Sequence, residues 1–521
     1  MLMHRTLMKS VRGFSVRWSS AQSQTQANSL GAENMIDPEW ATAKPFKSIP
    51  GPNFWQLFKG FSKGGCYDGL NLIELHKCLR KQFGDIYRVP AILGRHDVVM
   101  TFSPADFEKV FRTEGQQPMR RSFETMSYYR KEVRPELFGE MGGLVFSQGE
   151  LWQKMRSITN PVLLHPKTVK VYLEQVDEVC REFMTITANL RDDKNELPAD
   201  FDDWISRWAL EMTGVLALDS RLGVMHSKGS GEGHRIVDLV EEIFKLTYEL
   251  DVLPSVWKYV KTPKFRKLMK LFDELTDLIM DQIDRAMVRL QKNPTSDNNH
   301  SVLKKLLSIN KHVAVIMALD MIFAGIDTTS SGSVGVLYCL AKHPDKQAKL
   351  RDELRTIMPT KDTKLTASLM SNLPYLRACI KEGIRMFPST AGNFRATGKD
   401  IVLQGYRVPK NTDIAMGGQV LMRDENYFHR SQEYIPERWL NDRDVDIPSA
   451  KDVNPFIFLP FGFGSRSCIG KRLAMMEMEV LLARWIRQFE FRWNYEEYKF
   501  RTTVINLPGC PLKFEVRDVD Q

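Results

Sequence analysis

Residues 460–472 read Pro-Phe-Gly-Phe-Gly-Ser-Arg-Ser-Cys-Ile-Gly-Lys-Arg, and the pattern predicts an apolar helix directly afterwards, over about 473–485. A cysteine held in a Gly-rich turn before a helix faces inward-pointing backbone N–H groups and the positive end of the helix dipole. Both stabilise a thiolate, so this position predicts a lowered pKa for Cys468. The stretch therefore indicates a reactive or metal-ligating sulfur.

The other residues of this loop suit a flat, acidic ligand. Gly462, Gly464 and Gly470 allow the backbone to come close to such a ligand where a side chain would collide. Arg466, two residues before the cysteine, could neutralise an acidic group on it.

Three other interpretations of the loop can be compared. A phosphate-binding loop needs four residues between its glycine and Gly-Lys, then Ser or Thr. Here five residues separate Gly464 from Gly470, and Arg472 follows Lys471, so that interpretation fails. A catalytic thiol lacks an obvious His/Asn arrangement. A buried structural cysteine stays open on the spacing alone.

Composition limits the class of protein. The 521 residues are 43% hydrophobic and 26% charged, which is typical of a globular chain. The net charge of +9 is too mild to indicate nucleic-acid binding, but it suits an acidic protein partner. Seven scattered cysteines without a CxxC pair describe neither a disulfide framework nor a zinc site, and they favour a reducing compartment.

The N-terminal region has the pattern of a targeting signal. No acidic residue precedes Glu33, and an apolar stripe faces the basic residues Arg5, Lys9 and Arg12 on the other side of a helical projection. This predicts a mitochondrial transit peptide over residues 1–32, with a disordered basic tail or a surface-lying amphipathic helix as alternatives. No uninterrupted apolar run reaches about 20 residues, so no membrane-spanning helix is expected.

The body of the chain reads as mainly α with a smaller β portion. Apolar residues recur at three- and four-residue spacing from about 150 to 358, and strand-like segments follow residue 400. No repeat or long low-complexity segment divides it, which predicts a single domain over residues 33–521.

A second motif lies within the longest predicted helix. Residues 324–332 read Ala-Gly-Ile-Asp-Thr-Thr-Ser-Ser-Gly, a poor helix interior between strongly apolar flanks. We expect a distorted turn with an opened carbonyl that can hold water. Asp327 and Thr328 would then form a proton path to dioxygen; the alternative interpretation of this stretch is a polar helix end.

The pattern Phe461-x-x-Gly464-x-Arg466-x-Cys468-x-Gly470 is identified as the signature of the cytochromes P450. The resemblance implies a triangular, helix-rich fold in which haem b lies between the long central helix and the cysteine loop. It implies Cys468 as the axial ligand of the haem iron and Asp327 and Thr328 as the acid–alcohol pair.

Further residues resemble supporting positions of that family. Glu382 and Arg385, three apart on a predicted helix, would form with Arg438 a buried scaffold, although such a pair alone is usually a surface feature. Positions that would bind the haem propionates are Trp152, Arg156 and Arg395.

The resemblance also implies partners. The chain has no flavin or Fe–S motif, so electrons must come from outside, from a mitochondrial ferredoxin with its reductase and NADPH upstream. The expected basic contacts are Arg377, Lys381, Lys471 and Arg472. An apolar pocket predicts a lipophilic substrate that reacts with O2.

The chain resembles most the insect mitochondrial P450s of family 12, a group linked to xenobiotic metabolism; a steroid is the other substrate class considered. The mixed aromatic and basic segment 252–265 predicts peripheral contact with the inner membrane from its matrix side. Alternative functions are a haem-thiolate isomerase that rearranges peroxides and a haem sensor without turnover.

Overall fold

The computed structural model describes residues 37–121, 123–226, 231–292, 301–442 and 446–519. The predicted transit peptide, residues 1–32, lies outside these ranges. The helices of the described residues are α3 (Phe54–Phe61), α4 (Leu72–Phe83), α5 (Pro104–Thr113), α6 (Glu124–Tyr128), α7 (Pro135–Phe138), α8 (Gly149–Leu163), α9 (Pro166–Leu190), α10 (Phe201–Leu218), α11 (Glu232–Thr247), α12 (Pro263–Lys292), α13 (Val302–Ile309), α14 (Lys311–Ala341), α15 (Pro344–Ile357), α16 (Pro374–Met386), α17 (Gly418–Leu421) and α18 (Lys471–Gln488). The predicted mainly α fold is confirmed.

Short 3-10 and π-helical segments interrupt the connections. The 3-10 segments are η1 (Phe46–Ser48), η4 (Leu369–Ser371), η5 (Pro436–Trp439) and η6 (Gly464–Arg466), and the π-helical segments are η2 (Tyr129–Val133) and η3 (Tyr248–Val252). π-Helical turns are rare and frequently mark functional sites, so η2 and η3 draw attention to the connections that contain them.

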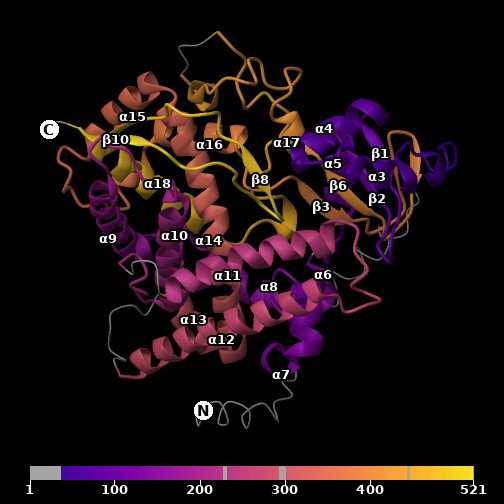
Figure 1. Ribbon diagram of the computed structural model, residues 1–521, viewed down its shortest axis with the longest axis horizontal. Coiled ribbons are helices and arrows are strands. Elements are labelled where there is room, and N and C mark those ends of the chain that lie inside the picture. The colour runs from indigo at the N-terminus through magenta and orange to yellow at the C-terminus, as the bar shows by residue number, and fades with distance from the viewer. Residues whose placement is uncertain (1–36, 122, 227–230, 293–300, 443–445, 520–521) are drawn as a thin grey trace, which may run out of the picture.

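The β portion is small and divided: the four-stranded sheet lies on the right of Figure 1, whereas the last strand, near the C-terminus, lies on the left. Strands β1 (Ile86–Val89), β2 (Val98–Thr101), β6 (Asp413–Met416) and β3 (Asn393–Ala396) form one sheet in that order, in which only the β2–β6 pair is parallel. Two-stranded sheets join β4 (Ile401–Leu403) to β5 (Tyr406–Val408), β8 (Phe500–Thr502) to β9 (Asn506–Pro508) and β7 (Phe489–Arg492) to β10 (Glu515–Asp518). The first sheet thus brings segments 86–101 and 393–416 together, far apart in sequence.

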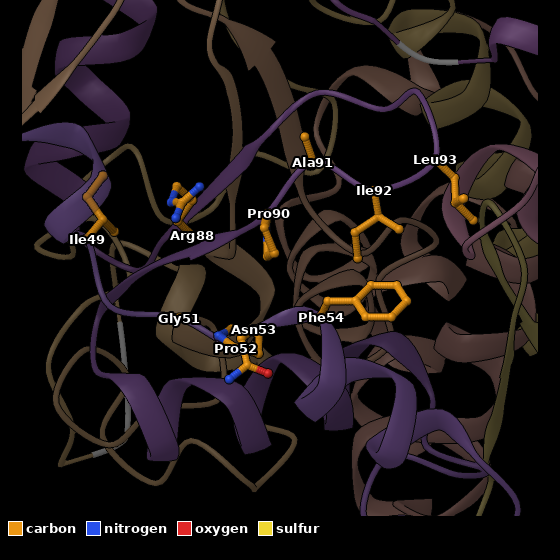
Figure 2. A pocket seen from close by; sticks show the side chains of 10 residues that line it. All are labelled: Ile49, Gly51, Pro52, Asn53, Phe54, Arg88, Pro90, Ala91, Ile92 and Leu93. Carbon is orange, nitrogen blue, oxygen red and sulfur yellow. The ribbon is translucent and has the colours of Figure 1, made fainter.

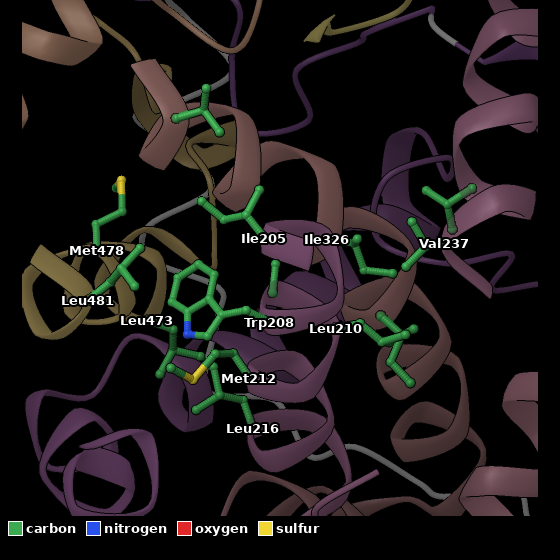
Figure 3. Packing of buried hydrophobic residues seen from close by; sticks show 14 of the residues in the cluster. Ile205, Trp208, Leu210, Met212, Leu216, Val237, Ile326, Leu473, Met478 and Leu481 are labelled. Atoms are coloured by element: carbon green, nitrogen blue, oxygen red, sulfur yellow. The ribbon is translucent and has the colours of Figure 1, made fainter. Parts of the chain in front are cut away.

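The long helix α14 runs through the middle of the molecule (Figure 1). It begins where the Asn310 side chain accepts a hydrogen bond from the backbone N–H of Val313, as an N-cap residue does. Helices α10, α11, α12, α16 and α18 all pack against it. Figure 3 shows Trp208 and Met212 of α10 in the core beside Leu473 and Met478 of α18.

Helix α14 bears on the expectation that no helix of this chain spans a membrane. Despite its polar interruptions, it is long and apolar enough to cross a membrane by length and composition. Most of its apolar window, 78%, is buried inside the protein. We therefore interpret α14 as the core helix of this fold, because a helix that is apolar all round needs burial on every side.

Candidate functional site at the cysteine loop

The cysteine loop is a tight turn that ends at the N-terminus of α18. The backbone N–H of Cys468 donates to Phe461 O (2.8 Å), and Gly470 is the N-cap residue of α18. Gly462 and Gly464 have φ values of +71° and +70°, which glycine adopts without the steric cost that a side chain brings. The turn therefore depends on these two glycines.

The sulfur of Cys468 is accessible although the residue lies deep in the protein. Burial raises the pKa of the thiol, against the lowering effect of the backbone N–H groups of Gly470 and Lys471 and of the guanidinium groups of Arg156 and Arg120. The expected net lowering is thus wrong for the protein by itself, because desolvation outweighs the helix terminus. A coordinated metal ion would remove the proton outright.

Four arginines gather around this loop, three of them buried and Arg120 half-buried. They are Arg120, Arg156, Arg395 and Arg466. Burial and the neighbouring guanidinium groups lower the pKa of Arg466 to about 8 and that of Arg120 to about 10. The nearby carboxylate is Glu114, which pairs with Arg395 (Nε–Oε2, 2.5 Å). The cluster is therefore short of negative charge.

Several N–H groups of these arginines have no hydrogen-bond acceptor among the described residues. Arg120 Nε, Arg156 Nε and Arg466 Nη1 are buried and find no hydrogen-bond partner within the described part of the chain. Buried donors of this kind are rare and usually face a ligand or water. Acidic side groups on a flat ligand over Cys468 would supply both the missing charge and the missing acceptors. The residues present therefore fit haem with its two propionates.

The three residues predicted to bind the propionates differ in how many contacts their side chains already make within the protein. Trp152 is buried, with the Arg466 guanidinium 4.0 Å from its ring centroid. Arg156 donates to Ser467 O (2.8 Å), which ties α8 to the loop. Arg395 is largely engaged, because it donates to Glu114, Phe394 O and Phe463 O. All three contact the cysteine loop; that they bind the propionates stays a prediction.

Arg120 and Glu114 were missed as site residues by sequence reasoning. Arg120 belongs to no motif, and Glu114 caps the C-terminus of α5, far from any motif. The signal was weak, since both lie more than 340 residues from Cys468 in the chain.

The acid and alcohol of α14 are placed as expected, but the helix is not distorted. The Thr328 hydroxyl donates to Ala324 O (2.7 Å), and α14 continues through this turn as a regular α-helix. The predicted opened turn is therefore wrong. The helix stays regular because its apolar flanks are packed on all sides. Ala324 O accepts the additional hydrogen bond from the Thr328 hydroxyl, and this does not break the helix.

Asp327 is buried, and its Oδ2 has no hydrogen-bond partner among the described residues. Burial raises its pKa to about 7; Glu241 of α11 adds to the rise, and Arg501 of β8 opposes it. Arg501 and Glu241 pair with each other at the surface (Nη2–Oε1, 2.7 Å), both about half exposed. The acid therefore lies between the interior and a charged pair in contact with water.

A second buried acid lies on α18. Glu477 is almost fully buried, and burial raises its pKa to about 8, while a hydrogen bond from Thr329 of α14 lowers it. Sequence reasoning did not find it. A glutamate in the middle of an apolar helix, nine residues after Cys468, was the available signal.

The scaffold around Glu382 is confirmed as a buried network. Its carboxylate accepts from Arg385 (2.8 and 2.9 Å), from Arg438 Nε (2.9 Å) and from Trp439 Nε1 (2.8 Å). Gly383, an unusual residue for a helix interior, lies where α16 crosses α14: a Cβ there would be 2.9 Å from the Cα of Val336. The close helix contact therefore requires glycine.

The predicted basic contacts form one cluster on the surface near the start of α18. The pKa of Lys381 is lowered chiefly by burial and further by the positive charges of Lys451, Arg377 and Lys471, which therefore lie near it. Lys381, Lys451, Lys471 and Arg472 are exposed. We call these four residues the basic patch. Arg377 differs, because Glu479 (3.1 Å) and two backbone carbonyls take up its guanidinium.

An accessible cysteine at a helix N-terminus, a cluster of unsatisfied arginines and a central helix with a buried acid together define a haem-thiolate protein. Comparison with known proteins agrees. The family model described as Cytochrome P450 matches residues 49–506. This chain therefore belongs to the cytochrome P450 family, whose members bind haem b, and it is a P450 monooxygenase.

Relatives and solved structures support this membership. Cytochrome P450 CYP12A2 of Musca domestica is 41% identical over 512 residues, 95% of each chain. Cytochrome P450 12b1, mitochondrial, of Drosophila acanthoptera is 43% identical over 496 residues, 94% of this chain and 93% of that protein. The structure titled retinoic acid bound cyanobacterial CYP120A1 has a TM-score of 0.70 at 20% identity, covering 86% of this chain and 95% of that one, and shows the fold alone.

Proposed function

We propose that this P450 oxygenates a lipophilic substrate with electrons from a mitochondrial ferredoxin. The bound haem would supply oxygen activation, with Cys468 as its ligand and Arg120, Arg156 and Arg466 holding its acidic groups. The observation that carries the proposal is the buried acid Asp327, with a pKa raised to about 7, beside Thr328. An isomerase or a sensor has no need of protons, whereas reduction of O2 consumes them.

Asp327 would move protons inward. Its carboxyl group can take a proton from the side of the Arg501–Glu241 pair and pass it on toward Thr328, whose hydroxyl is oriented by Ala324 O. A pKa near the working pH favours such a relay, because both protonation states are then populated.

We expect Asp327→Asn to lower kcat about 10²-fold, the range typical of a lost proton donor. The parent rate should fall as pH rises through about 7, because the carboxyl group is then ionised before it can donate. The variant should lose this dependence. Ferredoxin-supported turnover across pH measures both effects.

The matched control is Asp273→Asn on α12, an acid that pairs with Arg134 at the surface and should leave rate and profile unchanged. Parent-like kcat and pH profile in Asp327→Asn would remove the proposed role and favour the isomerase or sensor alternatives.

The basic patch is the proposed docking site for the ferredoxin. Opposite charges steer association and act most strongly at low salt. We expect Lys381→Glu/Lys471→Glu to slow reduction by ferredoxin about tenfold or more, with a weaker salt dependence than in the parent. Stopped-flow reduction measures this.

Lys270→Glu, an exposed lysine on α12, is the control and should reduce normally. Reduction by dithionite should be the same in all three proteins. If the double variant accepts electrons from ferredoxin at the parent rate, the patch is not the docking site.

An apolar surface proposed to contact the inner membrane lies away from the basic patch. On α3, Trp55 and Phe58 are 72% and 65% exposed, and beyond the β1–β2 turn Tyr259 is 69% exposed. A groove of about 460 Å³ separates α3 from this turn, with Phe54 and Leu93 on its walls (Figure 2). Exposed aromatic side chains of this kind favour a lipid interface.

The segment predicted from sequence for this contact, 252–265, presents four exposed apolar side chains, Val252, Val256, Tyr259 and Val260, but its other aromatic residues do not take part. Trp257 and Phe265 stack on each other and are buried, and Lys258 pairs with Glu124. The aromatic face of α3 was not predicted.

We expect Trp55→Ser/Phe58→Ser to lower binding to vesicles of phosphatidylcholine and cardiolipin about tenfold, because two large apolar side chains no longer insert. Cosedimentation measures the bound fraction. Ile309→Ser, exposed elsewhere, is the control. Equal binding of both variants and the parent would exclude this surface.

Location and substrate class complete the proposal. Relatives named mitochondrial, such as the 12b1 protein, support import into mitochondria, with residues 1–32 as the transit peptide and 33–521 as a single domain. The matrix side of the inner membrane would place the enzyme beside its ferredoxin. Xenobiotics are the favoured substrate class and steroids the second; a screen of binding-difference spectra with both classes tests this.

A further inference from the structure

A buried ion pair lies outside the haem loop and the proton path. Arg130 of η2 is 4% exposed and Asp320 of α14 is 3% exposed, with Nη1 and Oδ1 2.6 Å apart. The guanidinium also lies between two rings, 4.4 Å from the centroids of both Phe138 and Phe146. One cation is thus fixed by a carboxylate and by two aromatic faces.

The pair also fixes the course of the backbone beside it. Arg130 Nη1 donates to Gly142 O (2.9 Å), and Asp320 Oδ2 accepts from the N–H of Leu144 (2.7 Å). A Cβ on Gly143, whose φ is +108°, would lie 2.1 Å from Arg130 Nη1. The turn 142–144 therefore passes directly over the pair, and no other residue type fits at its centre.

This turn places Phe146 in a row of aromatic rings. The ring of Phe146 is 5.6 Å from that of Phe123 and 6.4 Å from that of Phe323, and Phe323 is 4.9 Å from Phe244. Phe323 precedes Ala324 on α14, next to the turn that ends at Thr328. The row therefore forms a wall beside the reacting end of the site.

The other side of Phe146 is fixed as well. The carbonyl of the next residue, Ser147, accepts from Arg466 Nη2 of the cysteine loop (2.9 Å). Phe146 is thus held between the cysteine loop and the Arg130–Asp320 pair, and it cannot move without loss of one of these contacts.

We propose that Arg130 and Asp320 are positioning residues that hold Phe146 inward and so limit the size of ligand admitted above the haem. The proposal deepens the proposed function and rests on its haem-thiolate site. A buried ion pair is seldom more stabilising than apolar residues of the same volume, so a role in geometry accounts for it better than a role in stability.

The test compares two haem ligands of different bulk on the full-length, haem-loaded protein. Imidazole is small, whereas clotrimazole carries three phenyl rings; both are followed by difference spectroscopy. In Arg130→Met/Asp320→Leu, we expect the unfolding temperature to stay near that of the parent and imidazole affinity to stay the same. Clotrimazole affinity should rise about tenfold or more, the range that added space in an apolar pocket gives.

A second variant, Phe146→Leu, keeps the ion pair and shortens the wall. It should raise clotrimazole affinity relative to imidazole in the same direction, and it answers the question if the double variant does not fold. An unchanged or lower clotrimazole-to-imidazole affinity ratio in Phe146→Leu, or in a folded double variant, overturns the proposal. If imidazole does not shift the spectrum of the parent, the haem-thiolate site itself fails.

Discussion

Cys468→Ser should abolish the strongly red-shifted Soret band of the reduced CO complex, and turnover should fall to background. As the proposed ligand, the Cys468 thiolate would donate electron density to the haem iron, which a serine hydroxyl would not. The loop should otherwise persist, because its geometry comes from the glycines at 462 and 464 and from the bond between Cys468 N and Phe461 O, which serine retains. The CO difference spectrum measures the effect.

The control is Cys66→Ser, since Cys66 is an exposed cysteine just after α3. That variant should keep both the parent spectrum and the parent turnover. If Cys468→Ser showed the parent CO spectrum, another residue would be the ligand and the central assignment would be wrong.

Glu382→Gln should destabilise the protein by about 3–5 kcal/mol, the cost typical of removing one partner from a buried ion pair. Glutamine keeps the shape but removes the charge that balances Arg385 and Arg438, and all three side chains are buried. Its amide group also presents donors toward guanidinium N–H groups. Denaturant unfolding monitored by tryptophan fluorescence measures the loss, and haem retention should fall with it.

The chain contains a matched control for this effect. Arg430 and Glu433 form another Arg–Glu pair three residues apart, but both side chains are about half exposed. Glu433→Gln should barely change the unfolding midpoint, because solvent screens such a pair. If the two variants were equally stable, the Glu382 network would not be a scaffold.

Local motifs were predictable because their function depends on residues close together in the chain. The turn at 460–472, the Asp327–Thr328 pair and the Glu382–Arg385 pair each lie within one turn or one helix. Gly464 and Gly383 illustrate the limit of this reasoning. The first is explained by its local φ, whereas the second needs the crossing of α14 by α16.

Contacts between distant segments were not predictable. Arg120 and Glu114 join the arginine cluster, and Asp320 meets Arg130, only because the fold brings their helices and turns together. The same reason explains Arg377, which was expected to be available to a partner and is instead paired with Glu479. The sequence does not show which oppositely charged residue a given arginine will contact in the folded protein.

The sequence by itself predicted the cysteine loop, the haem-binding class and the mainly α fold, because spacing within a turn or a helix dictates which side chains share a face. Only the tertiary structure decided how these groups behave. Burial raises the pKa of Cys468 and brings that of Asp327 to about 7, and the packing around Arg130 fixes Phe146. Desolvation and close packing depend on every neighbouring segment, so they emerge only when the chain is folded.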